Sequence, residues 1–170
     1  VYYLWFPITF GAAAVAALMP GNSTLRHRFL LSFILCWIFI GCLFAAAFSS
    51  VGPIYYDLVV GGTSEFKGLI AQLEGVDRLS PLRALGVRDM LWLAYTGESQ
   101  SIVSGISAMP SMHNAVCVLL FLAARHIGGR LAAASAVYAL LIFVGSVHLG
   151  WHYAIDAYAA AVLVAIIWKI

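Results

Sequence analysis

Four charge-free apolar runs alternate with polar segments along the chain. They cover 1–25, 29–56, 99–124 and 131–155, and a fifth, shorter run covers 153–168. Each of the first four is long enough for the roughly 20 apolar residues with which a helix crosses a hydrocarbon core. Lipid offers backbone groups no hydrogen-bond partner, and the period-two alternation of a barrel is missing. The pattern therefore predicts an all-α polytopic membrane helix bundle with five transmembrane helices.

The longest polar segment, at about 52–108, separates the second run from the third. Part of it has apolar residues at the i, i+3, i+4, i+7 spacing of an amphipathic helix, namely Phe66, Leu69, Ile70 and Leu73. A second helix is predicted to begin with Ser80 as N-cap and Pro81 at its first position. We predict a single domain over 1–170, in which this connection forms short helices on the membrane surface. A polar cap without a chemical role and a substrate-gating lid explain the connection equally well.

Composition supports a membrane location and excludes several other classes. Hydrophobic residues make up 64% of the 170 residues, charged residues 9%, and the mean hydropathy is +0.98. So little charge cannot cover a water-soluble globule. A net charge of +2 is too small to indicate a nucleic-acid partner. The three cysteines lie in apolar runs, where a free thiol behaves as a small hydrophobe, so no disulfide or metal site is predicted from them.

Charged residues divide between the two sides of the predicted bundle. The short connections and the end of the last run carry basic residues and no acid: Arg26, Arg28, Arg125, Arg130 and Lys169. By the positive-inside tendency this side faces the cytoplasm, and the connection at 52–108, with its six acids and four bases, faces outward. The chain then starts on the outer side, inside an apolar run and without methionine. We expect that at least one earlier helix precedes it, although a cleaved signal peptide would leave the same start.

Four ionisable residues lie within or beside the apolar runs: His113, His148, His152 and Asp156. Such groups are costly at membrane depth and are functional candidates. All four fall at the outer ends of the predicted helices. His152 and Asp156 are four residues apart, so on a helix they share a face, and the carboxylate can accept the imidazole N–H and fix its tautomer. His113 arrives from another helix as a second proton-transfer group.

The stretch "PSMH", Pro110 to His113, begins the third predicted helix. A helix N-terminus presents unpaired N–H groups to an anion, and Ser111 adds a hydroxyl donor. Two histidines beside an anion site, one of them next to Asp156, supply the nucleophile and the acid that phosphoryl transfer through a phosphohistidine requires. Taken singly, each residue has a purely structural explanation as a helix start or an interhelical hydrogen bond. Their joint occurrence at one side favours a catalytic site.

"PSMH", followed by "HYAID" about forty residues later, resembles the type 2 phosphatidic acid phosphatase (PAP2) superfamily. Its second motif is P-S-x-H and its third ends in H-x-x-x-D, and the resemblance covers about 29–170. It implies a six-helix core whose first helix precedes this chain. It also implies that His152 is the nucleophile, Asp156 orients it, His113 protonates the leaving group and Ser111 contacts the phosphoryl oxygens. The superfamily cleaves or exchanges phosphoester or pyrophosphate bonds of lipids and needs no metal or other cofactor.

The chain also departs from the superfamily pattern. The first motif, K-x-x-x-x-x-x-R-P, is not visible where "SSVGPIYYD" stands, and the arginine expected six residues before His152 is Ser146. The "GPIYY" stretch is similar to the branch of inositol phosphorylceramide synthases and sphingomyelin-synthase-like proteins, which transfers a phosphoalcohol head group between lipids. A phosphate among neutral histidines lacks a cation. We therefore predict that basic residues of the outer connection bind it, in the order Arg88, then Arg83 and Lys67.

The predicted function is that of a multi-pass lipid phosphatase or phosphotransferase. Its substrate is a phospholipid or an isoprenoid-lipid pyrophosphate, and its site lies on the extracytoplasmic, periplasmic or luminal face. A metal-dependent lipid hydrolase with His113, His148, His152 and Asp156 as ligands is an alternative, although di-iron lipid oxidases need more histidines than the five present. A transporter with a histidine proton relay is another. The sequence, however, lacks the paired discontinuous helices or inverted repeats that such folds usually have.

Overall fold

The computed structural model describes residues 2–18, 20, 23–61, 65–97 and 106–170. Within these ranges the chain is helical apart from its connections and one isolated antiparallel bridge between Val51 and Ser107. The all-α prediction is confirmed for this part of the chain. Glu98 and positions 99–105, where the third apolar run begins, lie outside the described residues.

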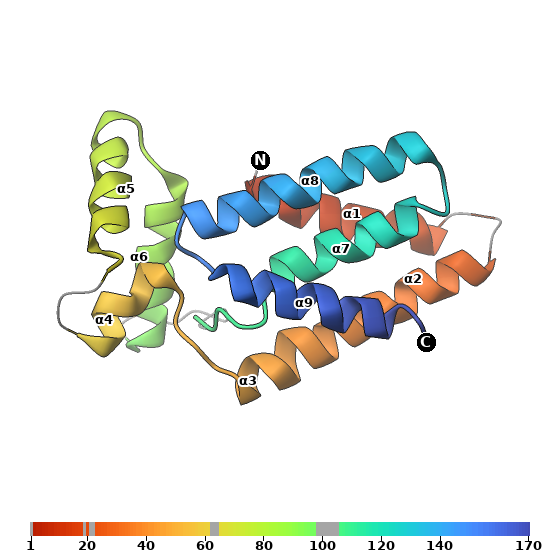
Figure 1. The fold of residues 1–170 in the computed structure, drawn as a ribbon, viewed down its shortest axis with the longest axis horizontal. Coiled ribbons are helices and arrows are strands. Elements are labelled where there is room, and N and C mark those ends of the chain that lie inside the picture. Colours follow the sequence, from red (N-terminus) through yellow and green to blue (C-terminus); the bar gives the residue numbers. More distant parts are fainter. Residues whose placement is uncertain (1, 19, 21–22, 62–64, 98–105) are drawn as a thin grey trace.

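Five long helical segments lie side by side, and consecutive ones run in opposite directions (Figure 1). They are η1–α1 (Tyr2–Leu4 and Trp5–Leu18), α2–η2–α3 (Ser23–Leu35, the π-helix Cys36–Phe44 and Ala45–Ala47), α7 (Met112–Ala124), α8 (Gly129–His148) and α9 (Ala154–Ile167). The central segment is α7, which contacts each of the other four. Its small buried residues Ala115, Ala123 and Ala124 let the neighbouring backbones approach closely. The helix that carries the "PSMH" motif is therefore the core of the bundle.

Two of the long segments are long and apolar enough to cross a membrane. Thr24–Ala47 has 24 residues, and the α-helix Gly129–His148 has 20, about 30 Å at 1.5 Å per residue. Only 22% and 11% of their most apolar windows are buried inside the protein, so their apolar side chains face outward. The other three, Tyr2–Leu18, Met112–Ala124 and Ala154–Ile167, are apolar but shorter. Five transmembrane helices therefore stays a prediction.

A second layer of helices, here called the short-helix layer, crosses one end of the bundle (Figure 1). It consists of η3 (Pro53–Tyr55), α4 (Tyr56–Val60), α5 (Lys67–Leu79) and α6 (Arg83–Tyr95). The predicted amphipathic helix is present as α5: Leu73 is buried, and Leu69 and Ile70 pack in the same cluster. The predicted start of the next helix is wrong. Ser80 follows α5 as its C-cap, and α6 begins after Leu82, whose N–H donates to Asp77 Oδ1 at 2.5 Å.

The helix boundaries differ from the apolar runs where backbone geometry overrides hydropathy. The helix α2 already begins at Ser23, so Arg26 and Arg28 lie in its first turns and not in a connection. The fourth segment ends at His148, well before the end of its apolar run, because Gly150 takes a positive φ of 73° and turns the chain toward α9. The third helix begins only at Met112, after a non-helical approach over 106–111.

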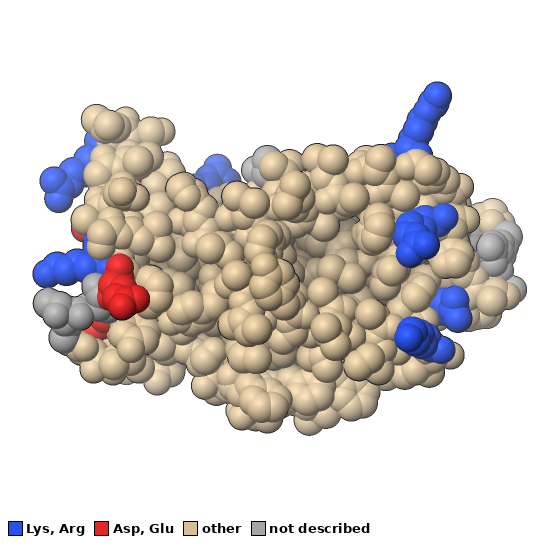
Figure 2. All heavy atoms as spheres, in the orientation of Figure 1, with Lys and Arg blue, Asp and Glu red and all other residues tan. Residues whose placement is uncertain are grey.

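Charge is confined to the two ends of the molecule on the face that Figure 2 shows. One end carries only Lys and Arg, the end with the short helices carries both signs, and the surface between them is uncharged. The first end, here called the basic end, contains the start of α2, the end of α7, the start of α8 and the end of α9 (Figure 1). This division agrees with the sidedness expected from the sequence, although which side of a membrane each end faces stays a prediction.

The segment after α3 holds together the two connections that lead into α7 and α9. The carbonyl of Ser50 accepts the N–H of Ala108 at 2.7 Å, and the carbonyl of Gly150 accepts the N–H of Ile54 at 2.8 Å. Gly52 lies so close to Trp151 that a Cβ on it would be 2.3 Å from the Trp151 carbonyl oxygen. The glycine of "GPIYY" is therefore required for this close approach.

We predict that Gly52→Ala lowers the midpoint of thermal unfolding, because a backbone carbonyl cannot move aside for the new methyl group. Overpacking of this kind typically costs about 1–3 kcal/mol. Gly75→Ala is the matched control: it lies within α5, and its Cβ would meet nothing within 4 Å. That substitution should leave the midpoint unchanged or raise it. A wild-type midpoint for Gly52→Ala, measured on the purified protein in detergent, would contradict the packing described.

Candidate active site

His152 lies in the connection between α8 and α9, and Asp156 is at the third position of α9. The expectation that both share one helical face is therefore wrong, since Tyr153 is the N-cap and the helix begins at Ala154. The Asp156 carboxylate accepts the N–H of Tyr153 at 2.8 Å through Oδ2. This bond caps α9 and fixes the backbone next to His152.

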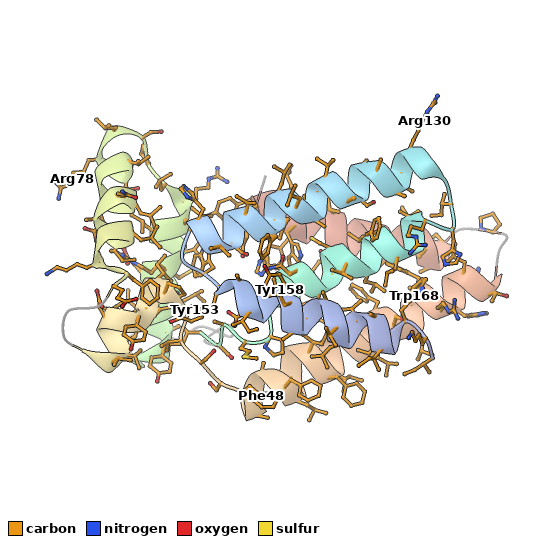
Figure 3. All side chains as sticks on the ribbon, in the orientation of Figure 1. Phe48, Arg78, Arg130, Tyr153, Tyr158 and Trp168 are labelled. Carbon is orange, nitrogen blue, oxygen red and sulfur yellow. The ribbon has the colours of Figure 1, made fainter. Side chains whose placement is uncertain are left out.

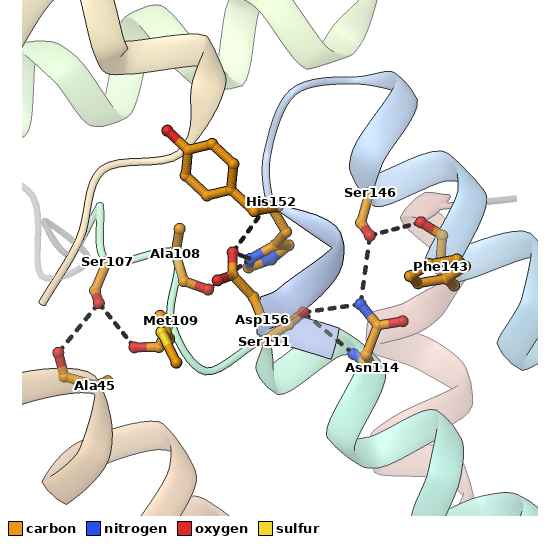
Figure 4. A network of polar contacts seen from close by, with 11 residues as sticks. Ala45, Ser107, Ala108, Met109, Ser111, Asn114, Phe143, Ser146, His152 and Asp156 are labelled. Carbon is orange, nitrogen blue, oxygen red and sulfur yellow. Dashed lines mark hydrogen bonds and ion pairs between the residues drawn. The ribbon is translucent and has the colours of Figure 1, made fainter. Parts of the chain in front are cut away.

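The Nδ1 atom of His152 has two oxygen neighbours (Figure 4). It is 2.7 Å from the carbonyl oxygen of Ala108 and 3.7 Å from Oδ2 of Asp156. A carbonyl can only accept, so Nδ1 carries the proton and Nε2 of the neutral ring keeps a free lone pair. The direct hydrogen bond expected between His152 and Asp156 is absent, and Ala108 fixes the tautomer instead. The carboxylate is near enough to stabilise a positive charge on the ring.

His113 lies in the first turn of α7, and its ring centroid is 5.9 Å from that of His152. Two aromatic residues from the beginning of the chain pack against it. The Tyr2 ring stacks on the imidazole at 4.8 Å, and the Trp5 ring is 4.3 Å away. Trp5 also donates from Nε1 to the His113 carbonyl at 3.1 Å. The first helical segment thus holds His113 in place, a contact that the sequence gives no means of predicting.

A buried polar network continues from the start of α7 to α8 (Figure 4). Ser111 is the N-cap of α7, and its hydroxyl accepts from the Asn114 side chain at 3.0 Å. The same Asn114 nitrogen lies 3.3 Å from Oγ of Ser146, which donates to the Phe143 carbonyl at 2.8 Å. Ser146 is the residue in place of the expected arginine, and its carbonyl accepts the N–H of His152 at 3.2 Å. Asn114 was not predicted from the sequence. An amide side chain three residues after the N-cap, inside an otherwise apolar run, is the signal that could have indicated it.

The three basic residues predicted to bind phosphate are not joined to this group. Among the described residues, no hydrogen bond or ion pair links a lysine or arginine to His113, His152 or Asp156. Arg88 instead pairs with Asp89 at 2.8 Å and Glu74 at 3.7 Å. Arg83 is within electrostatic range of Tyr3, which follows the residue stacked on His113. Lys67 begins α5 in the short-helix layer.

His148 also does not join the other histidines. It is exposed at the end of α8 and lines a groove against α5 with Leu69 and Leu73. The described ranges contain no group of three or more His, Cys, Asp and Glu side chains placed to hold a metal ion. The metal-dependent alternative therefore finds no ligand set in them.

The site lies where the long helices meet the short-helix layer, at the end opposite the basic end (Figures 1 and 4). This placement agrees with the expectation that the ionisable residues share one side. His152 and Asp156 are 8% and 1% exposed, and Ser111, Asn114 and Ser146 are buried with them. A free imidazole nitrogen, a second histidine and neutral hydrogen-bonding groups at a helix N-terminus can together perform phosphoryl transfer.

Comparison with known proteins agrees with this chemistry. A family profile described as the PAP2 superfamily matches residues 1–170, whereas no curated protein and no solved structure matches the chain. Members of the superfamily are generally phosphoesterases or phosphotransferases that act on lipid or other phosphoester substrates. Because the match covers the whole chain, the protein belongs to the PAP2 superfamily.

Proposed function

We propose that the protein is a membrane-embedded phosphotransferase that moves a phosphoalcohol head group from a phospholipid to an acceptor, through a phosphohistidine at His152. One observation carries the proposal: His113 at the start of α7 meets His152 and Asp156 at the start of α9, with the His152 proton held on Nδ1. Hydrolysis is the same reaction with water as the acceptor. Within the superfamily, we propose that the chain belongs to the branch of inositol phosphorylceramide synthases and sphingomyelin-synthase-like proteins, a proposal that the "GPIYY" stretch supports.

The bilayer surrounds the five long segments in this proposal. The exposed apolar faces of Thr24–Ala47 and Gly129–His148 would be costly in water and are at no disadvantage in lipid. The uncharged surface between the two charged ends supports the same placement (Figure 2). We assign the basic end to the cytoplasmic side by the positive-inside tendency, which puts the site on the extracytoplasmic or luminal face.

In the first step, the Nε2 lone pair of His152 attacks phosphorus and the bond to the leaving alcohol breaks. His113, protonated at that point, gives its proton to the departing oxygen. The His152 ring becomes cationic while Nδ1 still donates to Ala108, and the Asp156 carboxylate at 3.7 Å stabilises that charge. In the second step, the acceptor hydroxyl gives its proton to His113, its oxygen attacks phosphorus, and the P–N bond breaks to restore His152.

The groups placed to hold the phosphoryl oxygens are mostly neutral. They are the Ser111 hydroxyl and the first N–H groups of α7. A phosphodiester carries one negative charge, whereas a phosphomonoester carries about two at pH 7. A neutral set of donors therefore suits the diester, which supports head-group transfer over monoester hydrolysis. Arg83, Arg88 and Lys67 stay candidate cations, although among the described residues no hydrogen bond or ion pair joins any of them to the site. Arg88 already has two carboxylate partners.

A comparison of substrates tests this proposal. With the protein in liposomes, a phosphodiester phospholipid should be turned over about tenfold or more faster than phosphatidic acid of the same acyl chains or an isoprenyl pyrophosphate. A lipid alcohol added as acceptor should yield a new phosphorylated lipid, read by mass spectrometry. The His152→Ala variant gives the background rate for each substrate. Faster release of inorganic phosphate from the monoester or the pyrophosphate would identify a phosphatase and contradict the proposed transfer.

The two histidines should respond differently to the leaving group. His152→Ala should abolish turnover of every substrate, because no other group makes the bond to phosphorus. His113→Ala should lose on the order of 10² to 10⁴-fold with a lipid alcohol as leaving group. The loss of rate should be much smaller with an aryl phosphate ester, because an aryl oxygen departs without a proton. The measurement is acid-labile, base-stable label on the protein after rapid quench. Label that persists in His152→Ala, or that maps to His113, would reverse the two roles.

A further inference from the structure

One cavity of the bundle is lined by none of the catalytic residues. It has a volume of about 690 Å³ and opens between α1, α2, α7 and α8. Its wall is mostly apolar and includes Ala12, Ala16, Phe29, Leu120 and Ala134. Along α1 the lining starts at Ile8, ten positions before the end of the helix at Leu18, a rise of about 15 Å. One leaflet of a bilayer core has about the same depth, half of about 30 Å.

Two polar residues of this groove, Arg26 and His126, lie where a lipid head group would be. Arg26 is in the first turns of α2, and His126 directly follows the C-cap of α7, so both lie at the basic end. The other charged residues of that end are also basic: Arg28, Arg125, Arg130 and Lys169. Every acidic residue among the described ones lies either in the short-helix layer or beside His152. The groove is therefore mostly apolar over a length equal to the depth of one leaflet. The charged residues around its outer end are all basic.

We propose that this groove binds one acyl chain of an anionic phospholipid, with the lipid phosphate against Arg26 and His126. The proposal needs the bilayer but not the catalytic assignment. Lipid tails are as apolar as the groove, so burial alone gives no preference for one lipid. The preference comes from charge, because a basic pocket between membrane helices selects anionic head groups. For one basic residue near the surface, the expected preference is about fivefold.

The test uses two photoreactive lipids with the same diazirine-bearing acyl chain, a phosphatidylglycerol and a phosphatidylcholine. Each is added to the wild-type protein in nanodiscs, irradiated, and mapped by mass spectrometry of the peptides. Phosphatidylglycerol should label the groove residues of α1 and α8 about fivefold more than phosphatidylcholine. Labels at the short-helix end would report binding at the catalytic site, so the two sites are distinguished by position.

Two pairs of variants locate the lipid. Ala16→Trp fills the groove and should remove the labels, whereas Ala14→Trp, on the same helix but outside the lining, should retain them. Arg26→Gln should remove the preference for phosphatidylglycerol without preventing labelling. Arg130→Gln should retain it, because Arg130 is at the same end but points away from the bundle (Figure 3). All four variants should elute from size-exclusion chromatography as the wild-type protein does, which shows that they are folded.

Several results would overturn the proposal. Equal labelling by the two lipids would show that charge does not select the occupant. Labels that survive in Ala16→Trp would place the chain elsewhere, and a preference that survives in Arg26→Gln would exclude the head-group assignment. Absence of any label in the groove would show that another helix or a second copy of the chain fills it.

Discussion

The hydrogen bond from His152 Nδ1 to the Ala108 carbonyl is the contact on which the site depends. It joins the connection before α7 to the connection before α9, which are 44 residues apart in the chain. It also decides which imidazole nitrogen is free to react. Because the acceptor is a backbone atom, its position is set by the path of the chain and not by a side-chain rotamer. The reactivity proposed for His152 therefore depends on how the connections pack.

Those connections are in turn held by the segment that follows α3. The carbonyl of Ser50 accepts the N–H of Ala108, and Gly52 allows the backbone to lie against Trp151. Next along the chain, the Tyr55 ring stacks on Trp92 and contacts Trp151, and its hydroxyl donates to the Arg88 carbonyl. The "GPIYY" stretch thus links the short-helix layer to the backbone that directly precedes His152. A substitution in it would alter the site without touching a reacting atom.

Sequence patterns predicted the features that depend on burial and helix periodicity. The apolar faces, the amphipathic α5 and the placement of His113, His152 and Asp156 at one end follow from spacing alone. The partner of His152 could not be predicted, because every residue has a backbone carbonyl and none has a signature for accepting this bond. The start of α6 was missed because Asp77 caps it from the preceding helix. The packing of Tyr2 and Trp5 on His113 depends on the tertiary arrangement of α1 and α7.

The most direct test of this account is the tautomer of His152. In protein labelled with ¹⁵N-histidine and reconstituted in lipid, the His152 signals are assigned by their loss in His152→Gln. With the ring neutral, the account predicts a protonated Nδ1 and an unprotonated Nε2, because the Ala108 carbonyl can only accept. A neutral ring with its proton on Nε2 would contradict the account, since the nitrogen proposed to attack phosphorus would then have no free lone pair.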